Sequence, residues 1–222
     1  MKLGLFGGTF DPVHCGHLDV ARAAQRALQL DRLWLVPARI PPHRSMPHAS
    51  AAHRFAMVAM AVADDDALEV SDIEMDAPGP SYTVETLNQL AAMGISLSSV
   101  YLVTGADAFQ DVPTWKGFPD LLDRCHFIVV SRPGAAVTTL RETLPGLRDR
   151  MVDPEWRPGS RPGIFLVDVP TAAVSSTDVR RAISRGASLQ GLVPAAVAAH
   201  VTRHRLYSKP ASAAQVSPRT TA

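Results

Sequence analysis

The stretch from Gly7 to His17, near the N-terminus, constrains the fold more than any other part of the chain. It reads Gly-Gly-Thr-Phe-Asp-Pro-Val-His-Cys-Gly-His and follows a short apolar run, residues 3–6, that predicts a buried strand. An apolar periodicity over residues 18–28 predicts a helix directly after it. Such a turn is where α/β proteins bind phosphate, because the first helical N–H groups lack partners, and glycine permits close approach and positive φ. The turn therefore predicts an anion site.

Two histidines stand at the start of this predicted helix. His14 and His17 are three residues apart and so share one face, where imidazolium groups would neutralise phosphate charge. Both could instead satisfy core groups, or bind zinc, but a zinc site needs more ligands and only Asp11 and Cys15 lie nearby in sequence. The glycine patterns of the two common nucleotide fingerprints are absent. We therefore favour a phosphate role for both histidines over a metal role.

Composition limits the class of protein. The chain has 222 residues, of which 46% are apolar, enough for one α/β domain with an appendage. The 22 basic residues balance 21 acidic ones, so no overall charge attracts nucleic acid or membrane. Cys15 and Cys125 form no disulfide or metal pattern, and there is neither a signal peptide nor a long apolar run. We expect a cytoplasmic protein that binds neither nucleic acid nor membrane.

Apolar runs alternate with helical patterns along the rest of the chain. This alternation predicts a parallel, doubly wound sheet, in which ligands bind beyond the carboxyl ends of the strands. The predicted strands cover residues 3–6, 33–36, 68–75 (at an edge), 100–103, 127–130 and 164–169. The predicted helices cover residues 18–28, 50–63 (with Phe55, Val58, Ala59 and Val62 buried), 81–93 and 175–186, with a last helix starting at Pro194.

Further polar residues follow predicted strands or start predicted helices. Asp107 comes after the strand at residues 100–103, where it could simply cap a helix. Ser175 and Asp178 have the spacing of a capping box, so a well-capped helix with a surface Arg180 is the plain alternative to an anion site. Trp115 could pack in the core or stack its indole on an aromatic ligand.

The whole string from Gly7 to His17 resembles the H-x-G-H signature of the nucleotidyltransferases, and in particular of the nicotinate-nucleotide adenylyltransferases. Residues 174–180 resemble a second family motif, with Val174 in place of isoleucine, and Arg44 stands where the family has lysine. The resemblance implies a Rossmann-like fold with a small C-terminal helical segment. It also implies transfer of the adenylyl group of ATP to nicotinate mononucleotide, with Mg²⁺, by in-line attack on the α-phosphate.

The resemblance assigns roles to named residues. His14, His17 and Arg180 would be catalytic, and Tyr82, Thr83 and Trp115 would bind the mononucleotide. No residue is expected to bind a metal directly. Arg132 matches a family segment too, although a loop arginine is more often solvated. The positions expected to contact ATP and its phosphates are Gly7, Gly8, Thr9, Phe10, Arg44, Gly105, Asp107, Ser175, Ser176 and Thr177.

The chain is expected to form one domain followed by a tail. Residues 1–208 would make up a single nucleotidyltransferase domain, with its helical part from about residue 175. Residues 209–222 are small, polar and proline-containing, which predicts a disordered tail. A homo-oligomer is compatible with the sequence.

Three further functions are compatible with the same residues. A sister transferase could use another acceptor: nicotinamide mononucleotide, phosphopantetheine or a polyol phosphate, although Trp115 and Tyr82–Thr83 argue against the last two. A metal hydrolase could be built on Asp11, His14 and His17. A non-catalytic module could bind the nucleotide without releasing pyrophosphate.

Overall fold

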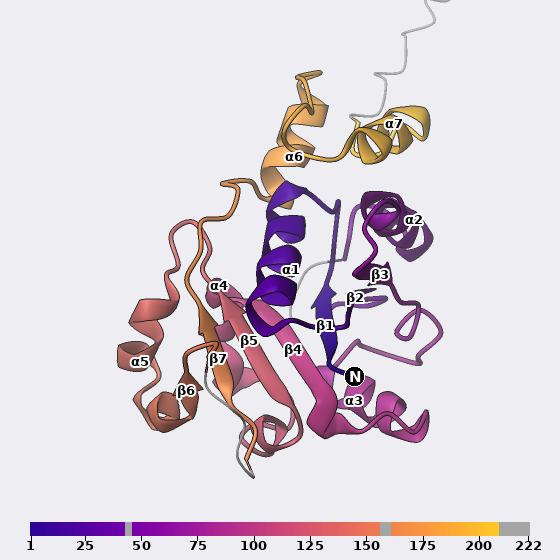
Figure 1. Ribbon diagram of the computed structural model, residues 1–222. Coiled ribbons are helices and arrows are strands. Elements are labelled where there is room, and N and C mark those ends of the chain that lie inside the picture. The colour runs from indigo at the N-terminus through magenta and orange to yellow at the C-terminus, as the bar shows by residue number, and fades with distance from the viewer. Residues whose placement is uncertain (43–45, 156–160, 209–222) are drawn as a thin grey trace, which may run out of the picture.

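Seven parallel strands form a single sheet in the computed structural model, which describes residues 1–42, 46–155 and 161–208 (Figure 1). Arg44 and the predicted tail at residues 209–222 lie outside the described residues. The spatial order is β3-β2-β1-β4-β5-β7-β6, which confirms the doubly wound parallel sheet. The strands are β1 (Leu3–Gly8), β2 (Arg32–Pro37), β3 (Leu68–Val70), β4 (Val100–Gly105), β5 (His126–Val130), β6 (Met151–Val152) and β7 (Ile164–Val167).

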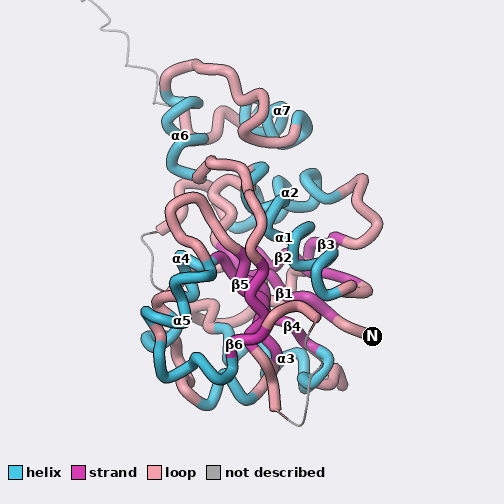
Figure 2. Tube along the Cα trace, turned by 60° about the vertical axis from the view of Figure 1, so that its left-hand side comes forward, coloured by secondary structure: helices cyan, strands magenta, loops and turns pink. Residues whose placement is uncertain are grey.

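Helices cover both faces of the sheet, and the last two lie together at one end of the molecule, beside α1 and α2 (Figures 1 and 2). Short 3₁₀ segments occur at Leu97–Ser99, Val112–Thr114, Asp120–Asp123, Val137–Thr139 and Pro145–Arg150. The α-helices are α1 (Cys15–Leu28), α2 (Ala51–Val62), α3 (Thr83–Ala92), α4 (Ala106–Phe109), α5 (Leu140–Thr143), α6 (Ser176–Ser184) and α7 (Ala195–Arg203). No helix among the described residues is both long and apolar enough to cross a membrane.

The strands are apolar on both faces, because each face packs against helices. On β4, Tyr101 and Val103 join a core with α1, α2, α6 and α7, whereas Val100 and Leu102 join a second core with α3 and α4. This alternation explains why the central strands appear in the sequence as continuous apolar runs. The sheet is thus buried on both sides, and its carboxyl edge remains to form a site.

The order of the strands changes direction at β1. From β1 the chain builds outward through β2 to β3, and it then returns to the other side of β1 to form β4. In a doubly wound sheet the crevice outside the carboxyl ends at such a switch point is the usual ligand site. Here the switch point places the turn after β1 next to the turn after β4.

Several predicted elements needed correction. The predicted strand at residues 68–75 is at the sheet edge, as expected, but it ends at Val70, and turns follow. On α2 the predicted buried face is partly wrong, because Phe55 and Ala59 are only half-buried while Arg54 and Met57 are fully buried. The elements α4, α5 and β6 were not predicted, since two to four residues carry too little periodicity to be recognised.

Candidate active site

The end of β1 is open to a ligand at Gly7. Gly7 is exposed, and an added Cβ there would meet no atom within 4 Å. A Cβ on Gly8 would lie 2.9 Å from the Phe10 ring, so Gly8 is required for space. The expectation that glycine supplies positive φ here is wrong: both glycines continue β1, paired with Val36 and Pro37, and the left-handed residue is Phe10, at φ 48°.

His14 and His17 lie against each other at the start of α1. Their ring centroids are 3.6 Å apart and the rings are nearly parallel, at 27°. The main-chain N–H of His14 donates to Nδ1 of His17 at 3.3 Å, which assigns the proton of a neutral His17 ring to Nε2. Phe10 packs edge-on against the His17 ring, with centroids 4.9 Å apart. The structure thus brings the two predicted histidines together and fixes the orientation of both.

The protonation state of His14 differs from the expectation. The side chain is 1% exposed, and burial, assisted by the charge of Arg132, lowers the pKa of His14 to about 3; Asp178 opposes this only in part. The predicted imidazolium is therefore wrong for His14 at neutral pH. A neutral ring contributes an N–H donor and bulk, whereas cationic charge at the site must come from arginine.

Asp11 ties several segments to this turn. Its buried carboxylate accepts hydrogen bonds from the main-chain N–H of His48 (2.8 Å) and of Ala49 (3.0 Å), and from the Tyr207 hydroxyl (2.8 Å). Burial alone would raise the pKa of Asp11, but these hydrogen bonds hold it below its usual range. Asp11 is consequently a structural anion, fully partnered, rather than a group poised to transfer a proton.

The N-terminus of α6 docks onto the same turn. Ser175 and Asp178 form the predicted capping box, with Ser175 Oγ accepting from the Asp178 N–H at 3.1 Å. Ser176 Oγ donates to the carbonyl of Pro12 at 2.9 Å. The helix start is thereby held against the turn that carries both histidines, at a point where its unpaired N–H groups favour an anion.

Arg180 spans the gap between α6 and the turn. Its Nη1 donates to the main-chain oxygen of Asp11 at 2.6 Å, and its Nη2 donates to Thr177 Oγ1 at 3.2 Å. The side chain remains 23% exposed, so one side of the guanidinium faces solvent. A recess of about 320 Å³ opens there, and its lining consists of His48, Thr177, Arg180, Arg181, Ser184 and Tyr207.

Arg132 also reaches the turn, although its sequence context does not distinguish it from a solvated arginine. Its Nη1 donates to the carbonyl of Gly16 at 3.3 Å. A Cβ on Gly105, which caps α4, would lie 2.9 Å from Arg132 Cγ, so the two segments are in close contact. Asp107 is exposed in the first turn of α4, and the alternative that it is the N-cap does not apply because Gly105 holds that position.

The predicted mononucleotide residues lie at the start of α3 and in the segment after α4, which meet at Lys116. Tyr82 caps α3 and is half-buried, like Thr83, and Lys116 Nζ lies 4.7 Å from the centre of the Tyr82 ring. Trp115 is half-buried and packs against the second core, so its indole is partly engaged in packing. The group is joined to the loop after β2, where the main-chain N–H of Ser81 donates to the carbonyl of Ile40 at 2.8 Å.

Arg54 is a structural residue that sequence reasoning missed. It is 1% exposed, and its guanidinium donates to the carbonyls of Thr9 (2.8 Å), Ala38 (2.6 Å) and Arg39 (3.1 Å). It thus joins the turn after β1 to the loop after β2. A helix arginine between apolar positions is normally taken as solvated, and no local signal marks this one as buried.

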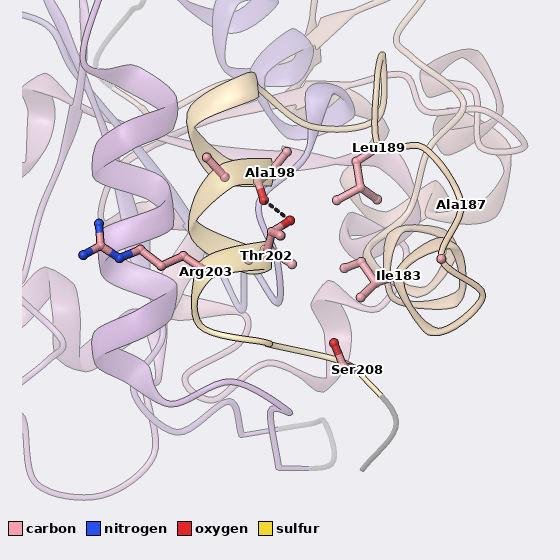
Figure 3. A pocket seen from close by; sticks show the side chains of 10 residues that line it. Ile183, Ala187, Leu189, Ala198, Thr202, Arg203 and Ser208 are labelled. Atoms are coloured by element: carbon pink, nitrogen blue, oxygen red, sulfur yellow. Dashed lines mark hydrogen bonds between the residues drawn. The ribbon is translucent and has the colours of Figure 1, made fainter. Parts of the chain in front are cut away.

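A groove of about 760 Å³ lies away from this site, between α6 and α7, where Ile183 and Leu189 face it while Arg203 points away (Figure 3). None of the predicted site residues that the structure describes lines this groove. In the same described part of the chain, no group of three or more His, Cys, Asp or Glu side chains is arranged to hold a metal ion. The turn after β1 is therefore the candidate active site.

Comparison with known proteins gives one consistent result. The family model described as cytidylyltransferase-like matches residues 5–182. A probable nicotinate-nucleotide adenylyltransferase of Roseiflexus sp. is 41% identical over 208 residues, which cover 92% of this chain and 97% of that protein. The corresponding Thermus thermophilus protein is 39% identical and is covered over its full length, with 93% of this chain matched.

Solved structures share the fold at lower identity. The Plasmodium falciparum nicotinic acid mononucleotide adenylyltransferase complexed with NaAD superposes with a TM-score of 0.73 at 16% identity, over 93% of this chain and 97% of that one. The same enzyme complexed with APC gives a TM-score of 0.71. At this identity the likeness establishes the Rossmann-like architecture.

Proposed function

The chain belongs to the nicotinate-nucleotide adenylyltransferase family, and we propose that its site transfers the adenylyl group of ATP to nicotinate mononucleotide, yielding nicotinate adenine dinucleotide and pyrophosphate. The observation that supports this most strongly is the meeting of three features at the carboxyl edge of the sheet: the turn with His14 and His17, the N-terminus of α6, and Arg180. Together they provide N–H donors and a cation for a polyphosphate.

The reaction needs alignment more than acid–base chemistry. A phosphate monoester is already ionised at neutral pH, so the mononucleotide phosphate attacks the α-phosphorus of ATP in line without a general base. The protein must bring two polyanions together and stabilise the charge that develops on the α-phosphate and the leaving pyrophosphate. We assign this stabilisation to His17 Nε2–H, the neutral His14 ring, and the guanidinium of Arg180.

For ATP we propose a path along the exposed backbone of Gly7 and the half-buried Gly8, past Thr9 and Phe10, to the start of α6. The hydroxyls of Ser175, Ser176 and Thr177 already have partners in Asp178, Pro12 and Arg180. Their role is therefore to hold the helix start, while its main-chain N–H groups and Arg180 meet the phosphates. Gly105 and Asp107 would lie on the nucleotide side of the crevice.

Mg²⁺ fits this site as a partner of ATP. Such an ion is usually held by substrate phosphates, water and one or two carboxylates, so it requires no cluster of protein ligands. The exposed carboxylate of Asp107, at the end of β4, is the described group best placed to assist. When bound, the ion would neutralise triphosphate charge, and the residues named above would orient the chain of phosphates.

For the acceptor we propose that Trp115, Tyr82 and Thr83 bind the pyridine ring and its carboxylate. The indole would stack on the ring, and the N–H groups at the start of α3 would meet the carboxylate. Donors of this kind favour nicotinate over the neutral amide.

Pyrophosphate release from ATP and Mg²⁺ tests the proposal, with nicotinate and nicotinamide mononucleotides as parallel acceptors. We expect rapid release with nicotinate mononucleotide and at least tenfold slower release with the amide, the effect of about 1.4 kcal/mol in selectivity. Faster release with the amide would contradict the acceptor assignment and keep the chemistry. ATP binding without release in either reaction would instead indicate a binding module.

A further inference from the structure

We infer that Tyr207 is a positioning residue for adenylyl transfer, acting through Asp11 on Arg180. The Tyr207 hydroxyl donates to Asp11 Oδ1 at 2.8 Å and so joins the end of the described chain to the turn after β1. The inference rests on the proposed function, because it names a further residue of the same site.

Asp11 connects Tyr207 to the groups that meet the phosphates. Arg180 Nη1 donates to the main-chain oxygen of Asp11 at 2.6 Å and lies 3.9 Å from its carboxylate oxygen Oδ2. Asp11 is also three residues from His14 in the same turn. The backbone of that turn is held separately by Ser176 at the Pro12 carbonyl, so a rotation of the Asp11 carboxylate acts on Arg180.

The hydroxyl of Tyr207 helps to hold the carboxylate at 3.9 Å from Arg180, a long distance for an ion pair. Oδ1 has two donors, Tyr207 and the main-chain N–H of Ala49, while Oδ2 is held by His48 at 2.8 Å. Without the hydroxyl, Oδ1 loses one of its two partners and the carboxylate can rotate toward the guanidinium. A closer ion pair there would reduce the charge that Arg180 offers to ATP.

The backbone around Tyr207 supports a specific role. Helix α7 ends at Arg203, and two non-glycine residues in the left-handed region, Arg205 at φ 51° and Tyr207 at φ 62°, then turn the chain back toward the site. Such conformations cost free energy and persist where the surroundings determine them. One constraint is visible: α7 is held to α2, where His53 Nδ1 and His200 Nε2 lie 3.1 Å apart.

Both members of the contact keep one protonation state. Burial and the neighbouring Asp11 charge raise the pKa of Tyr207, and hydrogen bonds lower the pKa of Asp11 despite its burial. The tyrosine is thus a permanent donor and the aspartate a permanent acceptor, which makes a charge-assisted hydrogen bond. Tyr207 consequently holds geometry and does not exchange protons with substrate.

Steady-state kinetics of Tyr207→Phe, which removes one oxygen atom, test the inference. We expect kcat/KM for ATP to fall roughly tenfold, the scale of one hydrogen bond to a charged group, with KM for nicotinate mononucleotide changed less than twofold. Tyr101→Phe is the matched control, because Tyr101 is the second residue of the central strand β4 and so lies at the amino ends of the strands, away from the site at their carboxyl ends. A value of kcat/KM for ATP within twofold of wild type in Tyr207→Phe would overturn the inference.

A double-mutant cycle with Arg180→Gln separates positioning from general stability. Once Arg180 is gone there is no cation to position, so adding Tyr207→Phe should change kcat/KM for ATP less than twofold. A second tenfold loss in that background would mean a structural role only and would overturn the inference. Melting temperatures of all variants verify that they are folded.

Failure of the proposed function gives a different result. If the wild-type protein released no pyrophosphate with any acceptor, the proposed function would be wrong. Calorimetric titration with ATP would then test whether Tyr207 still positions Arg180 for ATP binding. A roughly tenfold weaker Kd for ATP in Tyr207→Phe, absent in the Arg180→Gln background, would support the positioning role. Equal Kd values in wild type and variant would overturn it.

Discussion

His17 is the residue whose role follows most directly from its contacts. Its Nδ1 accepts from the main chain of His14, which leaves Nε2–H as the donor, and Phe10 holds the ring from the side. We expect His17→Ala to fold normally and to lose roughly 10²–10³-fold in kcat, the scale for one preorganised donor. His17→Gln, which restores an N–H near the same place, should recover part of the loss. Near-normal turnover of His17→Ala would contradict the assignment.

His14 makes a prediction about stability at the same scale. Its pKa is about 3 in the folded protein and near 6.5 when unfolded, so its contribution is present above pH 6.5 and is lost as the pH falls toward 3. At pH 5 this effect lowers the free energy of unfolding by about 2 kcal/mol. Urea unfolding should show that the free energy of unfolding falls less between pH 7 and pH 5 in His14→Asn than in wild type. An equal fall in the free energy of unfolding in both proteins would contradict the conclusion that burial keeps His14 neutral.

At the scale of elements, α2 holds two neighbouring loops in place through one buried arginine. Arg54 joins the turn after β1 to the loop after β2 by bonding to three carbonyls from those segments, which would lose their donor in Arg54→Met. We expect this substitution to lower the free energy of unfolding by about 3 kcal/mol. Arg22→Met is the control, since Arg22 is half-exposed in a surface pair with Asp65 and should cost at most about 1 kcal/mol. Chemical denaturation measures both, and equal losses would argue against the bridging role of Arg54.

At the scale of the whole molecule, the sequence predicted the sheet because its signals are local and repeated. Apolar runs and cap residues such as Ser175 report the conformation of their own segment, and the structure confirms the parallel, doubly wound arrangement. The turn with His14 and His17 was recognisable because all its residues are contiguous. The predicted ligand contacts of Gly105, Asp107 and Trp115 remain predictions, and Arg44 lies outside the described residues.

What the sequence did not predict depends on packing between distant segments. The neutral state of His14 follows from burial by elements placed later in the chain, and the roles of Arg54 and Tyr207 follow from partners 45 and 196 residues away. Neither an arginine on a helix nor a tyrosine after one carries a local signal of such a contact. Positive φ at Phe10 was likewise not predicted, because a phenylalanine rarely adopts it.

The contact between Tyr207 and Asp11 also has a consequence for protein synthesis. A ribosome makes the histidine turn among the first residues and Tyr207 some two hundred residues later. All seven strands have been translated by residue 167, before α6 and Tyr207 exist. A nascent chain can therefore hold all its strands and the histidine turn while Arg180 and Tyr207 are still missing. A product that ends just before Tyr207 would lack the contact that holds the Asp11 carboxylate.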